Sequence, residues 1–209
     1  MTTTLVLGTH NPGKVRELVE LLQPLGMELK SLADFLRPLE IDETGDSFPA
    51  NARLKAASQA RHLGAWILGE DSGIPVDALG GAPGIYSARY AGPVATDERN
   101  NARLLEELDN IPPERRTAHY VCQLALADPT GAIRAESGGI CRGRIRFEPV
   151  GCAGFGYDPL FEIVEYHRTC GELGEAVKSV LSHRARAVAT LSPLVALLLV
   201  DGQWPFHSP

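Results

Sequence analysis

The stretch Leu5–Leu22, with the sequence LVLGTHNPGKVRELVELL, decides the fold of this chain. An apolar run typical of a strand ends at Gly8, and from Val15 onward apolar residues recur at the i, i+3, i+4, i+7 spacing of a helix. The turn between them consists of Thr9, His10, Asn11, Pro12, Gly13 and Lys14. A strand, such a turn and a helix start predict a phosphate-binding site, because backbone N–H groups and a helix N-terminus attract an anion.

The same turn matches the first part of a P-loop. Gly8 to Lys14 has the spacing GxxxxGK, but the next residue is Val15 rather than Ser or Thr. The hydroxyl group that holds Mg²⁺ in a P-loop is therefore absent, and Pro12 lacks a backbone N–H group. We expect this turn to bind phosphate and other residues to hold any metal ion.

The composition is that of an ordinary globular protein. The chain has 209 residues, of which 44% are hydrophobic and 22% charged, and its formal net charge is −6. This charge argues against nucleic-acid or membrane partners, but it is compatible with a local basic site for a small anion. The length predicts one domain over residues 1–209 with ample material for a core.

The sequence favours a cytoplasmic location. The N-terminus has no basic segment followed by a long apolar stretch, so we expect no signal peptide. The longest apolar run, Leu194–Val200, is too short to span a bilayer. The four cysteines show no CxxC pairing, so a zinc site is not expected, and we interpret them as reduced.

Apolar patterns along the chain predict an α/β fold. Helices interleave with strands early and a long hairpin comes later, which favours a mixed sheet over a parallel one. The expected strands are Thr4–Gly8, Glu28–Leu32, Trp66–Leu68, His119–Ala127 and Ala132–Phe147. The expected helices are Pro12–Leu22, Pro49–Leu63, one from Thr96 to Leu108, and His183–Val200, the last either continuous or broken at Pro193.

Acidic residues follow the third expected strand. Glu70-Asp71-Ser72-Gly73 has the composition of a turn, which by itself indicates nothing beyond a solvated loop. An acid at the carboxyl end of a buried strand, however, lies where α/β folds bind ligands, and adjacent carboxylates suit Mg²⁺. A second acidic segment at Asp42 and Glu43 either completes this metal site or is a charged loop.

Two glycine-rich segments indicate turns with unusual backbone conformations. GGAPG at residues 80–84 is either a close approach of backbone or only a tight structural loop. GFGYDP at residues 154–159 places Phe155 and Tyr157 between glycines. An aromatic ring in such a turn can stack on a nucleobase and Asp158 can accept a hydrogen bond from its edge, whereas the simpler interpretation is a core aromatic at a turn.

Basic residues gather near the last expected helix. Lys178, His183 and Arg184 do not share one face of a straight helix, but they converge if a new helix begins at Ser182. Such a helix start would favour an anion or a carbonyl oxygen. The alternative is a solvated basic stretch.

Together, these segments resemble the inosine triphosphate pyrophosphatase family, which acts on noncanonical purine nucleoside triphosphates. The matching segments occur in the family's order from Thr9 to Arg184, and they are THNPGKVREL, DETGDSF with NARLKA, EDSG, GGAPGIYSARYAG, GFGYDP and KSVLSHR. GGAPGIYSARY and GFGYDP are highly specific. The resemblance covers nearly the whole chain.

The resemblance implies an elongated two-lobed α/β fold, with a long mixed β-sheet flanked by helices and a substrate cleft between the lobes. It also implies a homodimer that depends on Mg²⁺. The implied reaction hydrolyses ITP, dITP and XTP to the monophosphate and pyrophosphate, which removes deaminated purines from the nucleotide pool.

Individual residues also resemble functional positions of the family. Asp71 looks like the catalytic general base and a metal ligand, and Asp42 looks like a second metal ligand, one methylene shorter than the family's usual Glu. The residues similar to the substrate-binding set are Thr9, His10, Asn11, Pro12, Gly13 and Lys14 for the triphosphate, Ser72 and Lys178 as further contacts, and Phe155, Gly156, Tyr157, Asp158, His183 and Arg184 for the base.

The expected chemistry is attack of an activated water on the α-phosphorus, with Asp71 assisting its deprotonation. Whether Glu43 or Glu70 adds a metal ligand stays open at this point. A nucleotide-binding protein without catalysis and a phosphatase of broader range are the alternative functions, and the products formed from dITP separate them.

Overall fold

The computed structural model describes residues 3–204. Contacts within the chain divide it into two compact units, each built from separate segments. The first unit contains Met1–Asp71, Cys122–Gly139 and Arg184–Pro209, and the second contains Ser72–Val121 and Ile140–His183.

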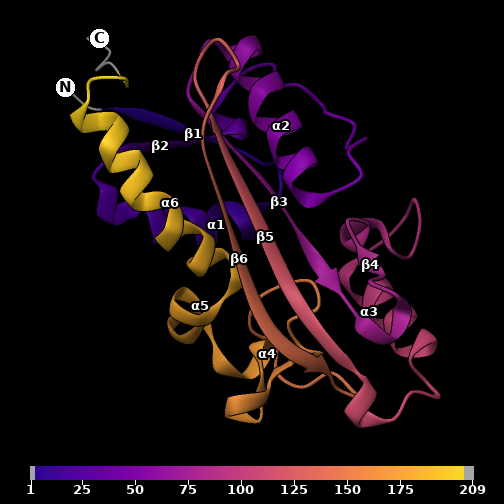
Figure 1. The fold of residues 1–209 in the computed structure, drawn as a ribbon. Coiled ribbons are helices and arrows are strands. Elements are labelled where there is room, and N and C mark those ends of the chain that lie inside the picture. The colour runs from indigo at the N-terminus through magenta and orange to yellow at the C-terminus, as the bar shows by residue number, and fades with distance from the viewer. Residues whose placement is uncertain (1–2, 205–209) are drawn as a thin grey trace. The chain divides into compact units, whose positions relative to one another are not determined.

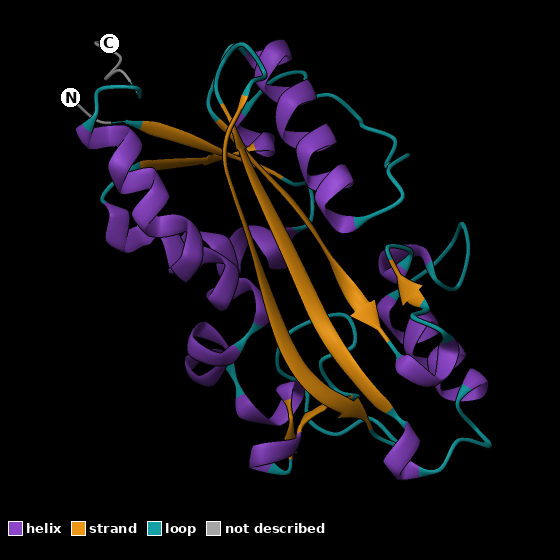
Figure 2. Cartoon of the chain, in the orientation of Figure 1, coloured by secondary structure: helices purple, strands orange, loops and turns teal. Residues whose placement is uncertain are grey.

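Strands and helices alternate early in the chain and a long hairpin follows, as predicted (Figures 1 and 2). The strands are β1 (Thr4–Gly8), β2 (Glu28–Ser31), β3 (Ile67–Pro75), β4 (Pro83–Gly84), β5 (Thr117–Ala127), β6 (Ile133–Ile145), β7 (Phe161–Ile163) and β8 (Arg168–Thr169). The α-helices are α1 (Pro12–Leu22), α2 (Phe48–Leu63), α3 (Asp97–Glu107), α4 (Cys170–Leu173), α5 (Glu175–Leu181) and α6 (His183–Val200).

The strands form a mixed sheet, which confirms the predicted α/β class. Their order is β2-β1-β3-β5-β6-β7-β8, with β4 paired to β3 outside this path. β1 runs parallel to both β2 and β3, whereas β7 is antiparallel to β6 and β8. β3, β5 and β6 contribute residues to both units.

Alternation along β1 organises the core of the first unit. Leu5 and Leu7 are buried in one cluster with Leu191 of α6 and with residues of α1. Val6, between them, is buried in a different cluster with Ala56 of α2. Because successive strand residues point to opposite faces, α1 and α6 cover one face of β1 and α2 covers the other.

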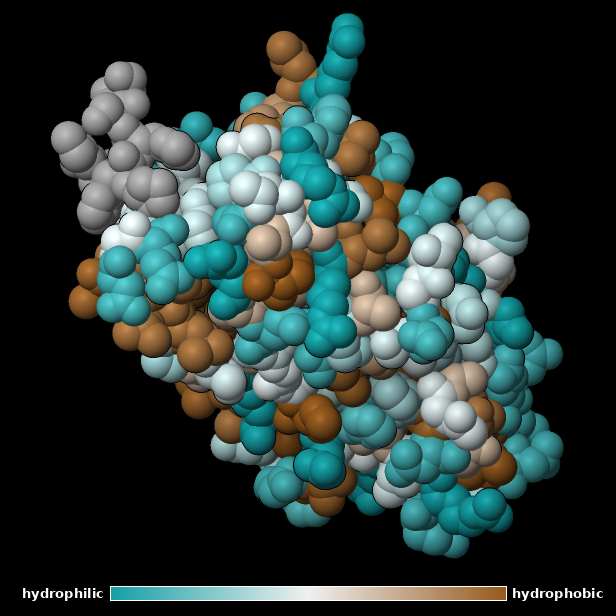
Figure 3. Space-filling view, turned by 45° about the horizontal axis from the view of Figure 1, so that its top comes forward, coloured by the Kyte–Doolittle hydropathy of each residue, from teal (hydrophilic) through white to brown (hydrophobic). Residues whose placement is uncertain are grey.

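Helix α6 is a core helix of this first unit. By length and composition it could cross a membrane, with a mean hydropathy of 1.3, but a buried core helix passes the same test. Leu191 and Val195 are fully buried, whereas Leu197 and Val200 are exposed. The helix continues through Pro193 without a break. Figure 3 shows hydrophilic residues over much of the face that it draws, with apolar residues in smaller groups.

The second unit has its own core. Ile74 of β3 and Tyr120 of β5 are buried with Leu104 of α3 and Phe161 of β7. The rings of Tyr120 and Phe161 lie 4.6 Å apart. This core fixes α3 beside the strands and thereby positions the residues that α3 carries.

The main difference from the predicted elements concerns β3. The strand was expected to end at Leu68, but it continues to Pro75, so Glu70 and Asp71 lie inside a strand rather than in a turn. The prediction was wrong because acids and glycine are depleted in strands. Local composition favoured a turn, and the tertiary environment overrides this preference by giving each acid a cationic partner.

Candidate active site

The predicted phosphate-binding turn leads from β1 into α1. Asn11 is the N-cap residue, and its Oδ1 accepts a hydrogen bond from the Lys14 N–H group at 3.1 Å. Thr9 Oγ1 accepts one from the Asn11 N–H group at 3.2 Å. Pro12 is the first helical residue, where a missing N–H group is tolerated. The predicted strand–turn–helix is therefore confirmed.

A cavity of about 230 Å³ adjoins this turn within the first unit. Its lining includes Thr9, Asn11 and Lys14 of the turn, Lys55 of α2, and Glu43 from the segment before α2. His10 also lines the cavity and is otherwise exposed. An anion in this cavity would meet a helix N-terminus and two lysine side chains.

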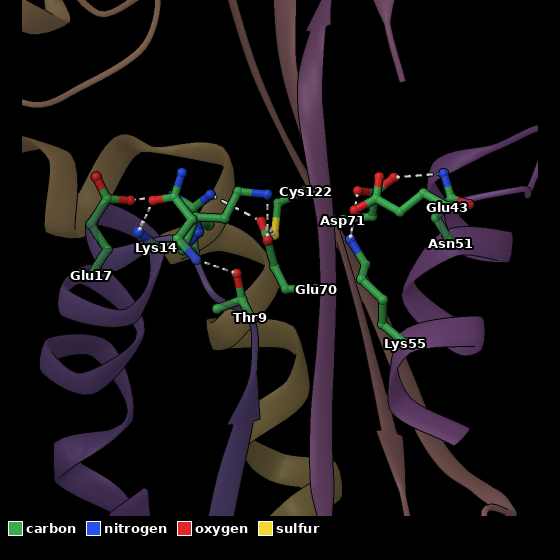
Figure 4. Close-up of polar contacts among 11 residues, drawn as sticks. Thr9, Lys14, Glu17, Glu43, Asn51, Lys55, Glu70, Asp71 and Cys122 are labelled. Atoms are coloured by element: carbon green, nitrogen blue, oxygen red, sulfur yellow. Dashed lines mark hydrogen bonds and ion pairs between the residues drawn. The ribbon is translucent and has the colours of Figure 1, made fainter. Parts of the chain in front are cut away.

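Glu70 and Asp71 point to opposite sides of β3 (Figure 4). Neighbouring strand residues alternate between the two faces of a sheet, so the two carboxylates have different partners. Glu70 faces Lys14 and Asp71 faces Lys55. Glu70, whose part in a metal site was left open, therefore faces away from Asp71.

Asp71 lies in a polar group with residues of α2. Its Oδ1 is 2.8 Å from Lys55 Nζ, and its Oδ2 accepts a hydrogen bond from Asn51 Nδ2 at 3.3 Å. Lys55 Nζ is also 3.0 Å from Glu43 Oε1. Burial raises the pKa of Asp71 more than Lys55 lowers it. Burial would lower the pKa of Lys55, but the nearby carboxylates raise it, so this ammonium stays charged.

Glu70 is fully buried and lies at the centre of a second polar group. Its Oε2 is 2.8 Å from Lys14 Nζ, and its Oε1 accepts a hydrogen bond from Arg184 Nη2 at 2.9 Å. Arg184 Nη1 donates to Glu17, and the Cys122 thiol donates to Glu70 at 3.6 Å. Burial opposes the charged form of Glu70, but Lys14 and Arg184 outweigh it and hold the pKa of this carboxyl well below its usual value.

The donor set around Asp71 fits a magnesium ion bound together with its substrate. Among residues 3–204, no three His, Cys, Asp or Glu side chains form a cluster that could hold a metal ion. Asp71 and Glu43 already share the positive charge of Lys55. Proteins usually bind Mg²⁺ through one or two carboxylates plus substrate phosphates, and these two side chains provide that number of oxygen ligands.

Asp42 lies outside this group, contrary to the prediction. Its side chain is exposed, whereas Glu43 is partly buried and reaches Lys55. Exposed and partly buried residues alternate through residues 40–46, and the Thr44 N–H group donates to the Asp42 carbonyl oxygen at 3.0 Å in a tight turn around Glu43. Glu43 therefore occupies the position that was predicted for Asp42.

Asp158 is the centre of a polar group in the second unit. Its Oδ1 accepts a hydrogen bond from the Tyr120 hydroxyl at 3.2 Å, and its Oδ2 accepts one from the Phe155 N–H group at 3.0 Å. Lys178 Nζ lies 2.8 Å from the same Oδ2 and 5.3 Å from the centre of the Phe155 ring. The structure thus brings Phe155 and Asp158 of the predicted base pocket together with Lys178, which was predicted as a further substrate contact.

His183 joins this group through an aromatic contact. Its ring stacks on Tyr120 with a centroid separation of 4.6 Å and an interplanar angle of 11°. Helix α5 ends at Leu181 and α6 begins at His183, which confirms the predicted new helix at Ser182. Burial, together with Asp158, raises the pKa of Tyr120 well above its usual value, so its hydroxyl remains a donor.

Arg184 lies outside the base pocket that was predicted for it, and Ser72, which was predicted as a further substrate contact, lies on β3. Both terminal nitrogens of Arg184 donate to carboxylates of the first unit, Glu17 and Glu70. Consecutive helix residues point about 100° apart, so His183 and Arg184 enter different groups. Ser72 follows Asp71 on β3 and is partly buried.

The sequence reasoning gave no role to Asn51, Lys55 or Tyr120. Asn51 and Lys55 are polar residues four positions apart on the buried face of an alanine-rich helix. This spacing places them side by side, and it could have indicated a functional pair. Tyr120 carried no such signal, because an aromatic residue in a strand is usually part of the core.

The fold and these groups define an α/β protein that binds an anionic ligand beside clustered carboxylates. The family model of the Ham1 family matches residues 5–194, and the chain belongs to that family. The resemblance drawn from the sequence motifs is thereby confirmed.

The relatives cover nearly the whole chain. The dITP/XTP pyrophosphatase of Rhodopirellula baltica is 51% identical over 195 residues, which is 93% of this chain and 94% of the relative. The dITP/XTP pyrophosphatase of Bacillus subtilis is 43% identical over 91% of this chain and 96% of its own length. The solved HAM1 protein of Coxiella burnetii has a TM-score of 0.84 and 36% identity, covering 94% of this chain and 100% of its own.

Proposed function

We propose that this chain hydrolyses noncanonical purine nucleoside triphosphates (ITP, dITP and XTP) to the monophosphate and pyrophosphate. The names of its relatives support this reaction. The structural observation that carries it is the cavity beside the phosphate-binding turn. Glu43 and Lys55 also line this cavity, and Lys55 contacts Asp71.

The proposed cofactor is Mg²⁺, held by Asp71 and Glu43 together with the substrate phosphates. When bound, the ion would neutralise charge on the triphosphate and make a water molecule more acidic. Glu43 replaces Asp42 in this proposal, because its carboxylate is the one beside Lys55.

The reaction itself assigns separate tasks to the side chains. Asp71 accepts a proton from the water that attacks the α-phosphorus. The bond between the α-phosphorus and the bridging oxygen then breaks, and pyrophosphate leaves. Lys14 and the backbone N–H groups of the turn, a group that Pro12 lacks, stabilise the charge on this leaving group.

The base binds to the group around Asp158 in the second unit. Phe155 offers a ring for stacking, and His183 and Lys178 provide donors near the 6-oxo group that hypoxanthine and xanthine carry. Adenine presents the opposite hydrogen-bond pattern at this edge, and each buried group left unsatisfied would cost about 1–3 kcal/mol. Gly156, Tyr157 and Ser72 complete the proposed contacts.

Arg184 has a supporting task in this proposal rather than a contact with the base. It holds Glu70, which in turn holds Lys14 beside the phosphate-binding turn. We further propose that the enzyme acts as a homodimer in the cytoplasm, where its nucleotide substrates are found. The mass in solution tests the first point, since a dimer has twice the mass of the chain.

Product analysis tests the proposed reaction. Purified protein is incubated with dITP, ATP or GTP and Mg²⁺, and pyrophosphate and orthophosphate are measured separately. We expect pyrophosphate from dITP, little product from ATP, and loss of activity of at least about a hundredfold in Asp71→Asn, which cannot accept the proton.

Other outcomes would contradict the proposal. Orthophosphate as the product would indicate a phosphatase. Equal rates of hydrolysis of dITP and ATP would show that the enzyme does not select the base. Tight binding of ITP without turnover at any divalent metal ion would indicate a nucleotide-binding protein. Asp42→Asn is the matched control, because this carboxylate lies nearby but is exposed.

A further inference from the structure

Two side chains of α3 hold the middle of the glycine-rich turn at residues 154–159. Asp97 Oδ2 accepts a hydrogen bond from the Gly156 N–H group at 2.7 Å. Asn101 Nδ2 donates one to the Gly156 carbonyl oxygen at 3.0 Å. Asp97 and Asn101 are four residues apart and so lie on the same face of α3. They bind both polar groups of Gly156 and so orient the two peptide planes on either side of its Cα.

Packing alone does not fix this part of the turn. A cavity of about 440 Å³ lies in the second unit beside it, lined by Asp97, Asn101 and Leu105 of α3 and by Phe155 and Gly156. A Cβ atom built on Gly156 would meet no other heavy atom within 4 Å among the described residues. The backbone of Gly156 is left-handed, with a φ of 63°. Gly156 itself is thus held by the two hydrogen bonds from α3, while its neighbours are held by the Phe155 N–H group on Asp158 and the Tyr157 hydroxyl on Ser87.

The other specific motif, GGAPGIYSARYAG, fixes α3 itself. Asn100 on α3 accepts a hydrogen bond from the Ala91 N–H group at 2.8 Å and donates one to the Ala88 carbonyl oxygen at 3.2 Å. The Tyr157 hydroxyl, in the turn, donates to the Ser87 carbonyl oxygen at 2.8 Å. The motif thus supports the turn twice, directly through Tyr157 and indirectly through α3.

We propose that Asp97 and Asn101 are positioning residues that set base selectivity by holding Gly156. This inference rests on the proposed function, in which Phe155 and Asp158 contact the base. Phe155 and Asp158 lie within two positions of Gly156, so a rotation of either peptide beside Gly156 changes where the ring or the carboxylate lies. Hydrogen-bond strength falls steeply with angle, and small displacements of a binding group change rates by large factors. Discrimination between similar bases therefore depends on the α3 contacts.

The test compares substrates in variants of α3. Asp97→Ala and Asn101→Ala each remove one bond to Gly156, and we expect each to raise KM for dITP and to lower the ratio of kcat/KM for dITP over dGTP by about tenfold. Asp97→Asn keeps an acceptor and should retain the selectivity of the native chain. Glu106→Gln, at an exposed position of the same helix, is the matched control.

Inhibition by tripolyphosphate separates positioning from a general loss of structure. Its inhibition constant should be unchanged in all α3 variants, because it binds without a base. Unchanged dITP selectivity in both alanine variants would overturn the inference, and so would an Asp97→Asn variant as impaired as Asp97→Ala. If the native chain does not hydrolyse dITP, the proposed function itself fails. This outcome differs from the two results that would overturn the inference about α3.

Discussion

Lys55 contacts both Asp71 and Glu43. This contact distinguishes Glu43 from Asp42, its neighbour in the sequence. Glu43 Oε1 is 3.0 Å from Lys55 Nζ, while the side chain of Asp42 is exposed. The tight turn around Glu43 separates the two side chains, and Glu43, not Asp42, reaches the lysine that contacts Asp71. Variants of Glu43 and of Asp42 should therefore differ in the Mg²⁺ concentration that they need for activity.

Glu43→Gln should weaken the response to Mg²⁺. Removing one of two carboxylate ligands lowers metal affinity, and we expect the Mg²⁺ concentration for half-maximal hydrolysis of dITP to rise about tenfold or more. The measurement is a Mg²⁺ titration of pyrophosphate release. Asp42→Asn serves as the control and should titrate like the native chain; a shift in this variant alone would contradict the assignment.

Glu70→Gln should destabilise the protein in a pH-dependent way. The variant leaves Lys14 and Arg184 without their shared carboxylate, and breaking a buried ion pair costs about 3–5 kcal/mol. The folded pKa of Glu70 is lowered from 4.5, so its stabilisation is present above pH 4.5 and is lost as the pH falls through the lowered value. The measurement is urea unfolding at neutral pH and at several acid pH values. The difference in the free energy of unfolding between the native chain and Glu70→Gln should become smaller as the pH falls.

A close approach of β3 and α2 determines the geometry of the Asp71 group. Gly69 of β3 faces the backbone of α2, and a Cβ atom there would lie 2.3 Å from the Ala52 carbonyl oxygen and 2.6 Å from the Ala56 nitrogen. Asn51 and Lys55 occupy the same turns of α2. The absence of a side chain at Gly69 therefore brings these two residues within reach of Asp71.

Gly69→Ala should force α2 away from β3. We expect a loss of about 1–3 kcal/mol in the free energy of unfolding from the overpacked contact, and a large fall in kcat, because Lys55 and Asn51 move away from Asp71. Chemical denaturation and dITP hydrolysis measure the two effects. Gly138→Ala is the matched control in β6, where the added Cβ meets only the flexible end of the Gln123 side chain; similar losses in both variants would contradict the explanation.

At the scale of the molecule, the first unit is assembled from the beginning, middle and end of the chain. Trp66, just before β3, stacks on Trp204, with ring centroids 4.1 Å apart at an angle of 14°. Trp204 is 1% exposed although it follows the last helix. Trp204 is thus part of the core of the unit that holds Asp71 and the phosphate-binding turn.

Trp204→Ala should therefore lower global stability rather than perturb only the chain end. Truncation of a buried aromatic residue costs about 3–5 kcal/mol, and thermal unfolding followed by circular dichroism should show a clear decrease in Tm. Leu197→Ala, at a position of α6 that is 57% exposed, should change Tm little. Equal shifts in the two variants would show that the stack is not part of the core.

Several features followed from short-range patterns. The turn at residues 9–14, helix α1, the hairpin of β5 and β6, and the new helix at His183 all agree with the sequence predictions. Apolar spacing, capping residues and turn formers act over a few residues, so they are visible in a single chain. The resemblance to a known family was carried by motifs of the same local kind.

The sequence by itself determined the elements with clear local patterns, such as β1, α1 and the β5–β6 hairpin, and which residue types are available for phosphate, metal and base. The tertiary structure alone decided which residues contact one another. Glu70 and Asp71 lie on opposite faces of β3, Glu43 rather than Asp42 contacts Lys55, and Arg184 pairs with Glu70 rather than with the base group. The physical reason is that a buried charge requires a nearby opposite charge. Which charge is near depends on how distant segments pack, and sequence spacing does not encode that distance.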